Sequence, residues 1–407
     1  MNTFDFENFD YEQAKEEVKN SIKKPNILLC GATGVGKSSL VNDIFELKIE
    51  DVGAASVGDD GRPKTQGIRK CTKENATVNL YDSEGYEVGN IGTEQKDRYY
   101  DVVISYIDKM RTEYPGEMER HIHEVWYCVS AGNKRFYEID KKIIETISNK
   151  KIPVMVLVTK VDQVDEDELE QLKDQIRAEV PDNVHIYTYS TTINKDEKIY
   201  KKYVQRSEII DWAIDNLDES LRLGLIPAVK GSLKEKRELI LKNCVPTYTA
   251  LAAAAVLGSS VVPVAFSDSI PLMAIQIKMA MSIFNAFKIK TDVKNVISDM
   301  VGTSAVSYIG KTLASQIVSW IPGIGQVAKA TVNTTVAASV TAVLGVGITL
   351  IAEQYLKACI DNNGAENLPF AEFLTKERFK ETMDYVNNHK KEFGIDKIIK
   401  NVVKKHK

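Results

Sequence analysis

Residues 31–38 read "GATGVGKS" and directly follow a short apolar run, "NILLC", at residues 26–30. From Lys37 onward, apolar side chains recur at helical spacing. The stretch therefore predicts a strand, a glycine-rich loop and a helix. A GxxxxGK[ST] loop between a strand and a helix is typical of a phosphate-binding P-loop. We expect a phosphate site here, at the end of the first strand.

Each residue type in this loop has a physical role in holding phosphate. Gly31, Gly34 and Gly36 let the backbone wrap the phosphate with its N–H groups pointing inward, where a Cβ would clash. Lys37 is expected to place its charge on the β- and γ-phosphates, and Ser38 to offer its hydroxyl to Mg²⁺. The loop residues expected to bind nucleotide are Gly31, Gly34, Val35, Gly36, Lys37, Ser38 and Ser39.

Similar apolar runs recur downstream, separated by helical patterns. They are "ATVNLYD" (76–82), "VWYCVS" (125–130), "PVMVLVT" (153–159) and "HIYTYS" (185–190). Strands that alternate with helices predict a parallel α/β sheet. "IRKCT" and the first of these runs flank the short turn "KEN". They predict one antiparallel hairpin at the edge of that sheet.

Two further motifs lie where predicted strands end, and they identify the nucleotide. Asp82 and Gly85 form a DxxG pattern, whose carboxylate can hold the Mg²⁺ shell and whose glycine N–H can reach the γ-phosphate. Thr159, Lys160 and Asp162 form a TKxD pattern after another strand. A carboxylate there accepts hydrogen bonds from guanine N1–H and the 2-amino group, which adenine lacks. Because open α/β sheets bind ligands at strand carboxyl ends, we expect GTP and GDP there.

With these motifs, residues 24–215 resemble the Era-like branch of the Ras-like GTPases. The resemblance implies that Thr65 closes onto Mg²⁺ and the γ-phosphate, and that Ser190 falls at the family's last base-contact motif. Thr159 stands where Asn is commoner, a variant expected to loosen the hydrogen bonding between loops. The resemblance implies that the metal ion is bound by Ser38, Thr65 and Asp82. It also implies that the catalytic residues are Lys37, Thr65 and Gly85.

One position departs from the family pattern in a way that bears on catalysis. Ras-type enzymes carry a water-orienting Gln directly after the DxxG glycine, and here that residue is Tyr86. A tyrosine cannot position water in the same way, so we expect a GTPase with slow intrinsic hydrolysis. The water is then placed by a backbone group, by Glu84 or Glu87, or by a partner. Arg62 and Arg69 are either solvated loop residues or groups that neutralise developing charge.

The amino-acid composition indicates the cellular compartment and the kinds of partner. The 407 residues carry a net charge of -4, with a pI near 5.9, which indicates no general attraction to nucleic acid. The five cysteines are scattered without a CxxC pair, as expected of free thiols in a reducing compartment. The N-terminus lacks the basic start and apolar core of a secretory signal. We therefore expect a cytoplasmic protein.

Uncharged runs at 243–267 and 330–352 mark a change of composition in the second half. Over roughly 225–360 the chain resembles a helical domain of uncharacterised function that follows Era-like GTPase domains in bacteria. The resemblance rests on "KEKRELILK", "PLMAIQIKMA" and "IPGIG". The segments "FSDSIP" and "IPGIG" predict turns between apolar helices. The expected organisation is a helix (1–23), a Ras-like P-loop GTPase domain (24–215), a helical linker (216–242), an all-α bundle (243–360) and amphipathic helices (361–407).

The uncharged runs leave two functions open. They are long enough to span a membrane, which takes about 20 apolar residues, but Pro246 and Pro263 in the first run favour a buried soluble core. The last helix carries Ile395 and Val402 on one face between lysines, and it either packs on the bundle or lies on an anionic membrane. The first function is a GTP-driven switch with a helical output domain and an effector or activating protein. The alternative is a membrane-associated, self-assembling GTPase of the dynamin-related or interferon-inducible kind.

Overall fold

The computed structural model describes residues 10–45, 67–72, 76–87, 93–193, 200–257, 272–289, 334–361 and 370–405. The chain forms two compact units. One is Lys23–Lys230, and the other joins Met1–Ile22 to Gly231–Lys407. The segment predicted as a linker, 216–242, contributes to both units. Thr65, Arg62 and the two predicted turns at 266–271 and 321–325 lie outside the described residues.

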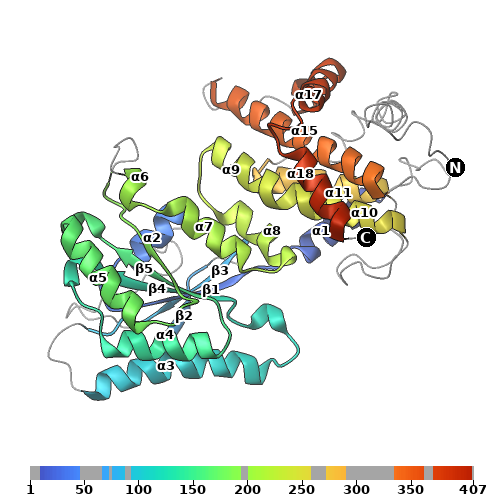
Figure 1. Ribbon diagram of the computed structural model, residues 1–407. Coiled ribbons are helices and arrows are strands. Elements are labelled where there is room, and N and C mark those ends of the chain that lie inside the picture. The colour runs from blue at the N-terminus through green and yellow to red at the C-terminus, as the bar shows by residue number, and fades with distance from the viewer. Residues whose placement is uncertain are drawn as a thin grey trace. The chain divides into compact units, whose positions relative to one another are not determined.

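A six-stranded sheet forms the centre of the unit Lys23–Lys230 (Figure 1). Neighbouring strands are parallel except for the pair at one edge, where Arg69 lies opposite Asp82. The mostly parallel sheet with an antiparallel edge hairpin is therefore confirmed. In the order β2-β3-β1-β4-β5-β6, the strands are β1 (Asn26–Cys30), β2 (Ile68–Lys70), β3 (Asn79–Ser83), β4 (Glu124–Ser130), β5 (Val154–Thr159) and β6 (His185–Thr188).

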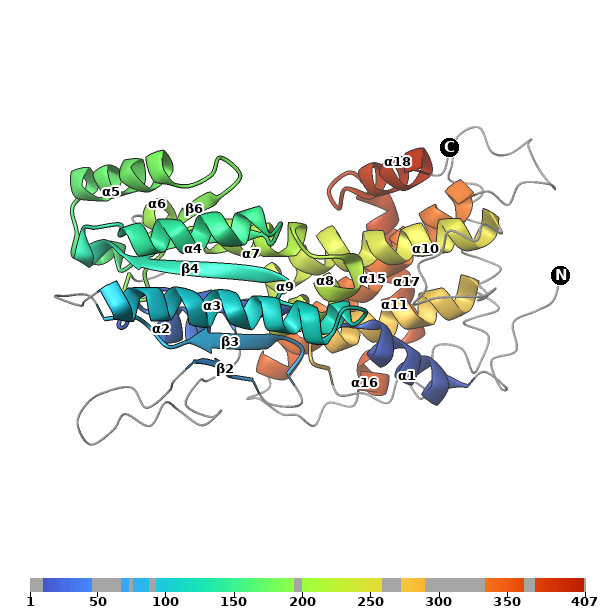
Figure 2. The ribbon, with the colours of Figure 1, turned by 90° about the horizontal axis from the view of Figure 1, so that it is seen from below.

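Helices cover both faces of this sheet, as Figures 1 and 2 show. On one face lie α2 (Lys37–Ile44) and α7 (Arg206–Asp215), and on the other lie α3 (Thr93–Glu113) and α4 (Glu138–Asn149). The unit also contains α5 (Glu166–Glu179), α6 (Tyr200–Tyr203), α8 (Glu219–Ala228) and 3-10 turns at Met118–Arg120, Ala131–Asn133 and Val161–Gln163.

The two covered faces explain the continuous apolar strands. Successive side chains of a strand point to opposite faces. On β4, Trp126 stacks on Phe45 after α2, with ring centroids 5.5 Å apart, whereas the Tyr127 hydroxyl donates a hydrogen bond to Asp140 of α4. Because neither face of β4 meets water, all seven of its residues are buried.

The other unit is helical, as predicted for the C-terminal half. A π-helical turn at Ile240–Cys244 joins α9 to α10. Pro246, in the first turn of α10, has no N–H to donate and its ring crowds the carbonyl four residues back, which accounts for the wider turn. The helices are α1 (Tyr11–Ser21), α9 (Leu233–Leu239), α10 (Val245–Leu257), α11 (Leu272–Ala286), α15 (Thr334–Asp361), α16 (Phe370–Phe373), α17 (Lys376–Asn388) and α18 (Ile395–Lys405).

Helix α15 lies at the centre of this unit and contacts α10, α11, α17 and α18. Gly347 permits the approach of α17, because a Cβ there would lie 2.0 Å from Cε of Met383. The segment Ala337–Ile360 is long and apolar enough to cross a membrane, but 89% of its most apolar stretch is buried. Val402 of α18 packs with Ala253 and Ala338. Both features favour the soluble-core interpretation of the apolar runs and of the last helix.

Buried charged side chains of these helices include Glu353 and Lys278. Glu353 of α15 is 3% exposed and pairs with Arg237 and Lys357, each at 2.8 Å. Lys278 of α11 is also 3% exposed and pairs with Glu17 of α1. Since a buried charge is stable only when it is paired, the second contact ties α1 to the C-terminal helices.

Candidate nucleotide-binding site

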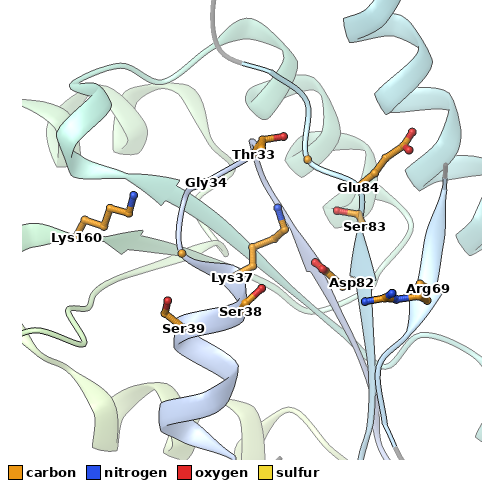
Figure 3. Close-up of a pocket in the computed structure, with 12 residues that line it drawn as sticks. Thr33, Gly34, Lys37, Ser38, Ser39, Arg69, Asp82, Ser83, Glu84 and Lys160 are labelled. Carbon is orange, nitrogen blue, oxygen red and sulfur yellow. The ribbon is translucent and has the colours of Figure 1, made fainter. Parts of the chain in front are cut away.

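A cavity of about 340 Å³ lies where β1 and β3 end (Figure 3). The phosphate loop contributes Thr33, Gly34, Gly36, Lys37, Ser38 and Ser39 to its wall. The edge hairpin contributes Arg69 and residues 82–85, and the loop after β5 contributes Lys160. Residues from three motifs that are far apart in the sequence therefore surround one cavity.

The phosphate loop has the backbone that its glycines predict. Gly31 has a φ of +127°, and a Cβ there would lie 2.1 Å from the carbonyl oxygen of Cys128. The Lys37 side chain is buried, and its ammonium donates to the carbonyls of Gly31 and Ala32 at 3.0 and 3.1 Å. Gly36 caps α2 without a side-chain hydrogen bond, so the first N–H groups of α2 are left for an anion.

Asp82 and Ser38, two of the three predicted metal ligands, both line the cavity. The pKa of Asp82 is raised by burial, an effect opposed by the charges of Lys37 and Arg69. Among the described residues, the buried Oδ1 of Asp82 has no hydrogen-bond partner. A carboxylate oxygen without a partner beside a serine hydroxyl fits Mg²⁺, which takes few protein oxygens and completes its shell with phosphate and water. The third predicted ligand, Thr65, lies outside the described residues.

The DxxG segment abuts the phosphate loop. The Thr33 N–H donates to the carbonyl of Tyr86 at 2.8 Å. A Cβ on Gly85 would lie 2.3 Å from the Thr33 nitrogen, so only glycine fits. The Glu84 N–H donates to the carbonyl of Gly67 at 3.0 Å. Gly85 thus forms part of the cavity wall next to Thr33. Its contact with a γ-phosphate stays a prediction.

Tyr86 turns its side chain away from the cavity. Its hydroxyl donates to Oδ1 of Asp140 at 2.6 Å, and its ring lies 5.2 Å from that of Tyr99 and 6.4 Å from that of Tyr137. Tyr86 is buried, and it is absent from the cavity wall. Its place agrees with the expectation that it does not orient water. No motif in the sequence indicates the contact of Tyr86 with Asp140.

On the base side, Thr159 joins two loops. Its hydroxyl donates to the carbonyl of Val35 in the phosphate loop, and to that of Val129 at 3.2 Å. The threonine therefore makes a hydrogen bond between the two loops. The loosening expected from its replacement of Asn stays a prediction. Lys160 follows in the left-handed region with a φ of +55°, which directs the chain around the cavity.

Asp162 and Ser190, predicted separately, are brought together. The Ser190 hydroxyl donates to Oδ1 of Asp162 and lies 2.8 Å from that of Thr192. Partial burial alone would raise the pKa of Asp162, but hydrogen bonds from Ser190 and Thr192 and the charge of Lys160 bring that pKa below its ordinary value. The carboxylate is therefore charged at neutral pH and oriented by a neighbouring hydroxyl, as an acceptor for two N–H donors requires.

Comparisons with known proteins bear on residues 23–223, which match the septin family model. Septin-8-A of Danio rerio is 24% identical over 225 residues, which are 52% of this chain and 48% of that protein. The probable GTP-binding protein EngB of Finegoldia magna is 25% identical over 176 residues, or 43% of this chain and 80% of that one. A crystal structure of a probable GTP-binding protein engB covers 47% of this chain and 97% of its own, at 15% identity and a TM-score of 0.32.

These matches are partial. The chain covers less than half of the length of these septins, namely 48% of Septin-8-A and, at 25% identity, 40% of Septin-10 of Rattus norvegicus. Residues 23–223 are therefore similar in sequence to the septins, and the six-stranded sheet with its phosphate loop has the P-loop GTPase fold. The sequence similarity does not support the narrower Era-like assignment made from the motifs.

Proposed function

Taking residues 23–223 as a septin-type GTPase domain, we propose that this chain binds GTP and GDP with Mg²⁺, hydrolyses GTP slowly and acts as a nucleotide-driven switch. The observation that carries the proposal is the single cavity that Lys37, Asp82 and Gly85 share. These residues bring an ammonium group, a carboxylate and a glycine backbone to one space. That combination suits a triphosphate with its metal ion.

The phosphates are held mainly by the loop. Lys37 is fixed by two loop carbonyls, so its charge is positioned before the nucleotide arrives. Asp82 and Ser38 would hold Mg²⁺, which would supply positive charge to the phosphates. Asp162 selects guanine, because its charged carboxylate accepts from the two N–H groups that adenine lacks.

Slow hydrolysis follows from the placement of Tyr86. Its hydroxyl is bound to Asp140, so it is not free to hold a water molecule beside the γ-phosphate. Glu84 lies in the cavity wall but is paired with Arg98 of α3 at 3.6 Å. Since Tyr86 does not orient water in this proposal, the rate depends on Glu84 or Glu87, on a backbone group or on a residue supplied by a partner.

The helical unit is the proposed output. Nucleotide can shift its equilibrium only if GTP and GDP bind two conformations with different affinity. The partner that responds to the nucleotide state is proposed to be an effector, an activating protein or a second copy of the chain. The proposed location is the cytoplasm. The alternative is action on a membrane. It rests on the apolar segment Ala337–Ile360, which is mostly buried here, and the switch is therefore the function proposed.

Calorimetry tests the nucleotide assignment, and hydrogen exchange tests the switch. GDP and GTP should bind in the presence of Mg²⁺, whereas ADP should not, and comparable affinities for GDP and ADP would refute the assignment. Hydrogen exchange in residues 243–360 should differ between the GDP and GTP-analogue states. Equal exchange in the two nucleotide states would refute the switch. Flotation with anionic liposomes in either state would favour the membrane alternative.

A further inference from the structure

A buried carboxylate lies behind the nucleotide cavity and has no part in the roles assigned above. Asp140, in the first turn of α4, is 2% exposed. Its Oδ1 accepts hydrogen bonds from the hydroxyls of Tyr86 and Tyr127, each at 2.6 Å. Its Oδ2 accepts from the N–H of Tyr137 at 3.0 Å. Burial and the adjacent carboxylate raise the pKa of both hydroxyls, so both remain donors at physiological pH.

One of these two tyrosines reaches the cavity wall through its backbone. Tyr86 directly follows Gly85, and its carbonyl accepts from the Thr33 N–H at 2.8 Å. Gly85 and Thr33 both line the cavity. Gly85 also lies too close to Thr33 for any side chain. The position of the Gly85 N–H therefore depends on where Tyr86 is held.

A third tyrosine joins the same cluster to the phosphate loop. The Tyr99 hydroxyl accepts from the Gly31 N–H at 2.8 Å and lies 2.9 Å from the Ser83 hydroxyl. Its ring contacts that of Tyr86. Two helices, α3 and α4, thus hold the DxxG segment from behind. The segment is anchored at Ser83 and at Tyr86, on either side of Gly85.

We infer that Asp140 is a positioning residue that, through Tyr86, fixes Gly85 at the γ-phosphate side of the cavity and so raises the affinity for GTP relative to GDP. The inference rests on the proposed function. Fixing a loop in its binding conformation removes the cost of ordering it when the ligand binds. GDP has no γ-phosphate to meet Gly85, so its affinity should depend little on this anchor.

The two hydroxyls on Asp140 provide a matched pair of variants. Tyr86→Phe removes the bond that holds the DxxG segment. Tyr127→Phe removes a bond of equal length to the same oxygen from β4, and Tyr127 is absent from the cavity wall. Both changes leave the ring and remove one buried hydroxyl, so both should lower the midpoint of thermal unfolding. A purely structural role would therefore affect the two variants alike.

The affinities should separate them. Tyr86→Phe should weaken binding of a non-hydrolysable GTP analogue about tenfold, the size of one net hydrogen bond, and change GDP affinity less than about twofold. Tyr127→Phe should change both affinities less than about twofold. In steady-state hydrolysis, the KM of Tyr86→Phe should rise about tenfold with kcat unchanged, because the lost interaction is made equally in the ground and transition states.

Asp140→Ala provides a second route to the same result. It should lower the GTP-to-GDP affinity ratio as Tyr86→Phe does, and the double variant should show no further fall, because both changes break one connection. The inference would be overturned if Tyr86→Phe had the same GTP-to-GDP affinity ratio as the wild type, or if Tyr127→Phe lowered that ratio as much as Tyr86→Phe does. Either result would leave the proposed function standing. A wild-type chain that binds no guanine nucleotide would overturn the proposed function and this inference with it.

Discussion

Replacing Asp162 by Asn tests the guanine site most directly, because it changes the acceptor while keeping its shape. The carboxylate is charged at neutral pH, since its hydrogen bonds bring its pKa below the ordinary value. Guanine N1–H and the 2-amino group are expected to donate to its two oxygens. In Asn, one oxygen becomes an NH₂ group, so one charge-assisted bond is lost and a donor faces a donor.

The magnitude follows from these two effects. A hydrogen bond to a charged group contributes about 1.5–3 kcal/mol, and an unpaired donor costs about as much again. We expect Asp162→Asn to weaken GDP binding by about 3 kcal/mol or more, which is roughly 150-fold. Xanthine carries a carbonyl where guanine has its amino group, so xanthosine diphosphate should bind the variant better than GDP does.

Displacement of a fluorescent GDP analogue by GDP, xanthosine diphosphate and ADP measures the preference. Ser190→Ala is the control, because it removes a hydroxyl that orients Asp162 but leaves the carboxylate in place. It should weaken GDP binding only about fivefold, or about 1 kcal/mol, with the preference for guanine intact. Asp162→Asn that keeps GDP affinity within about threefold of the wild type would refute the assignment of Asp162.

Three further predictions concern the loop lysine, a buried glutamate and the helical unit. Lys37→Ala should abolish nucleotide binding in calorimetry, because the phosphates lose the ammonium held in the loop. Glu124 is fully buried, and this burial raises its pKa above the ordinary value of 4.5. The stability that the protonated side chain contributes is therefore fully present below pH 4.5. It is lost as the pH rises through the raised pKa. The unfolding free energy should therefore fall with pH by up to about 1.4 kcal/mol per unit in the wild type but not in Glu124→Gln. Arg237→Met should destabilise the helical unit by about 2–3 kcal/mol, because it leaves the Glu353 charge buried, whereas Lys357→Met removes an exposed partner of the same carboxylate and should cost about 0.5 kcal/mol. Denaturant unfolding should distinguish the last two variants.

Much of the fold could be predicted because its signals are local. Each parallel strand is a buried apolar run between helical patterns, and β4 and β5 begin within one residue of the predicted runs. The site could be predicted for the same reason. The phosphate loop, the DxxG segment and the TKxD segment all follow strands, and parallel strands bring their carboxyl ends to one edge.

The contacts behind the site depend on long-range packing and could not be predicted. Asp140 lies in "EIDKKIIETISNK", where an acid near the start of an amphipathic helix is usually solvated. Its burial depends on tyrosines from segments that sequence spacing does not relate to α4. The packing of α1 with the C-terminal helices could not be predicted for the same reason. Glu17 of α1 pairs with Lys278, which lies 261 positions further along the chain.

The position after Gly85 links these findings to the slow hydrolysis proposed. A side chain there can reach toward the γ-phosphate and hold water, or it can turn back and anchor the loop, but it cannot do both. In this chain Tyr86 turns back to Asp140, so the anchor that favours GTP binding removes a water-orienting group from the cavity. Tight discrimination between GTP and GDP and slow turnover are then consequences of the same side-chain orientation. A long-lived GTP state suits a switch whose partner, rather than its own chemistry, determines when the signal ends.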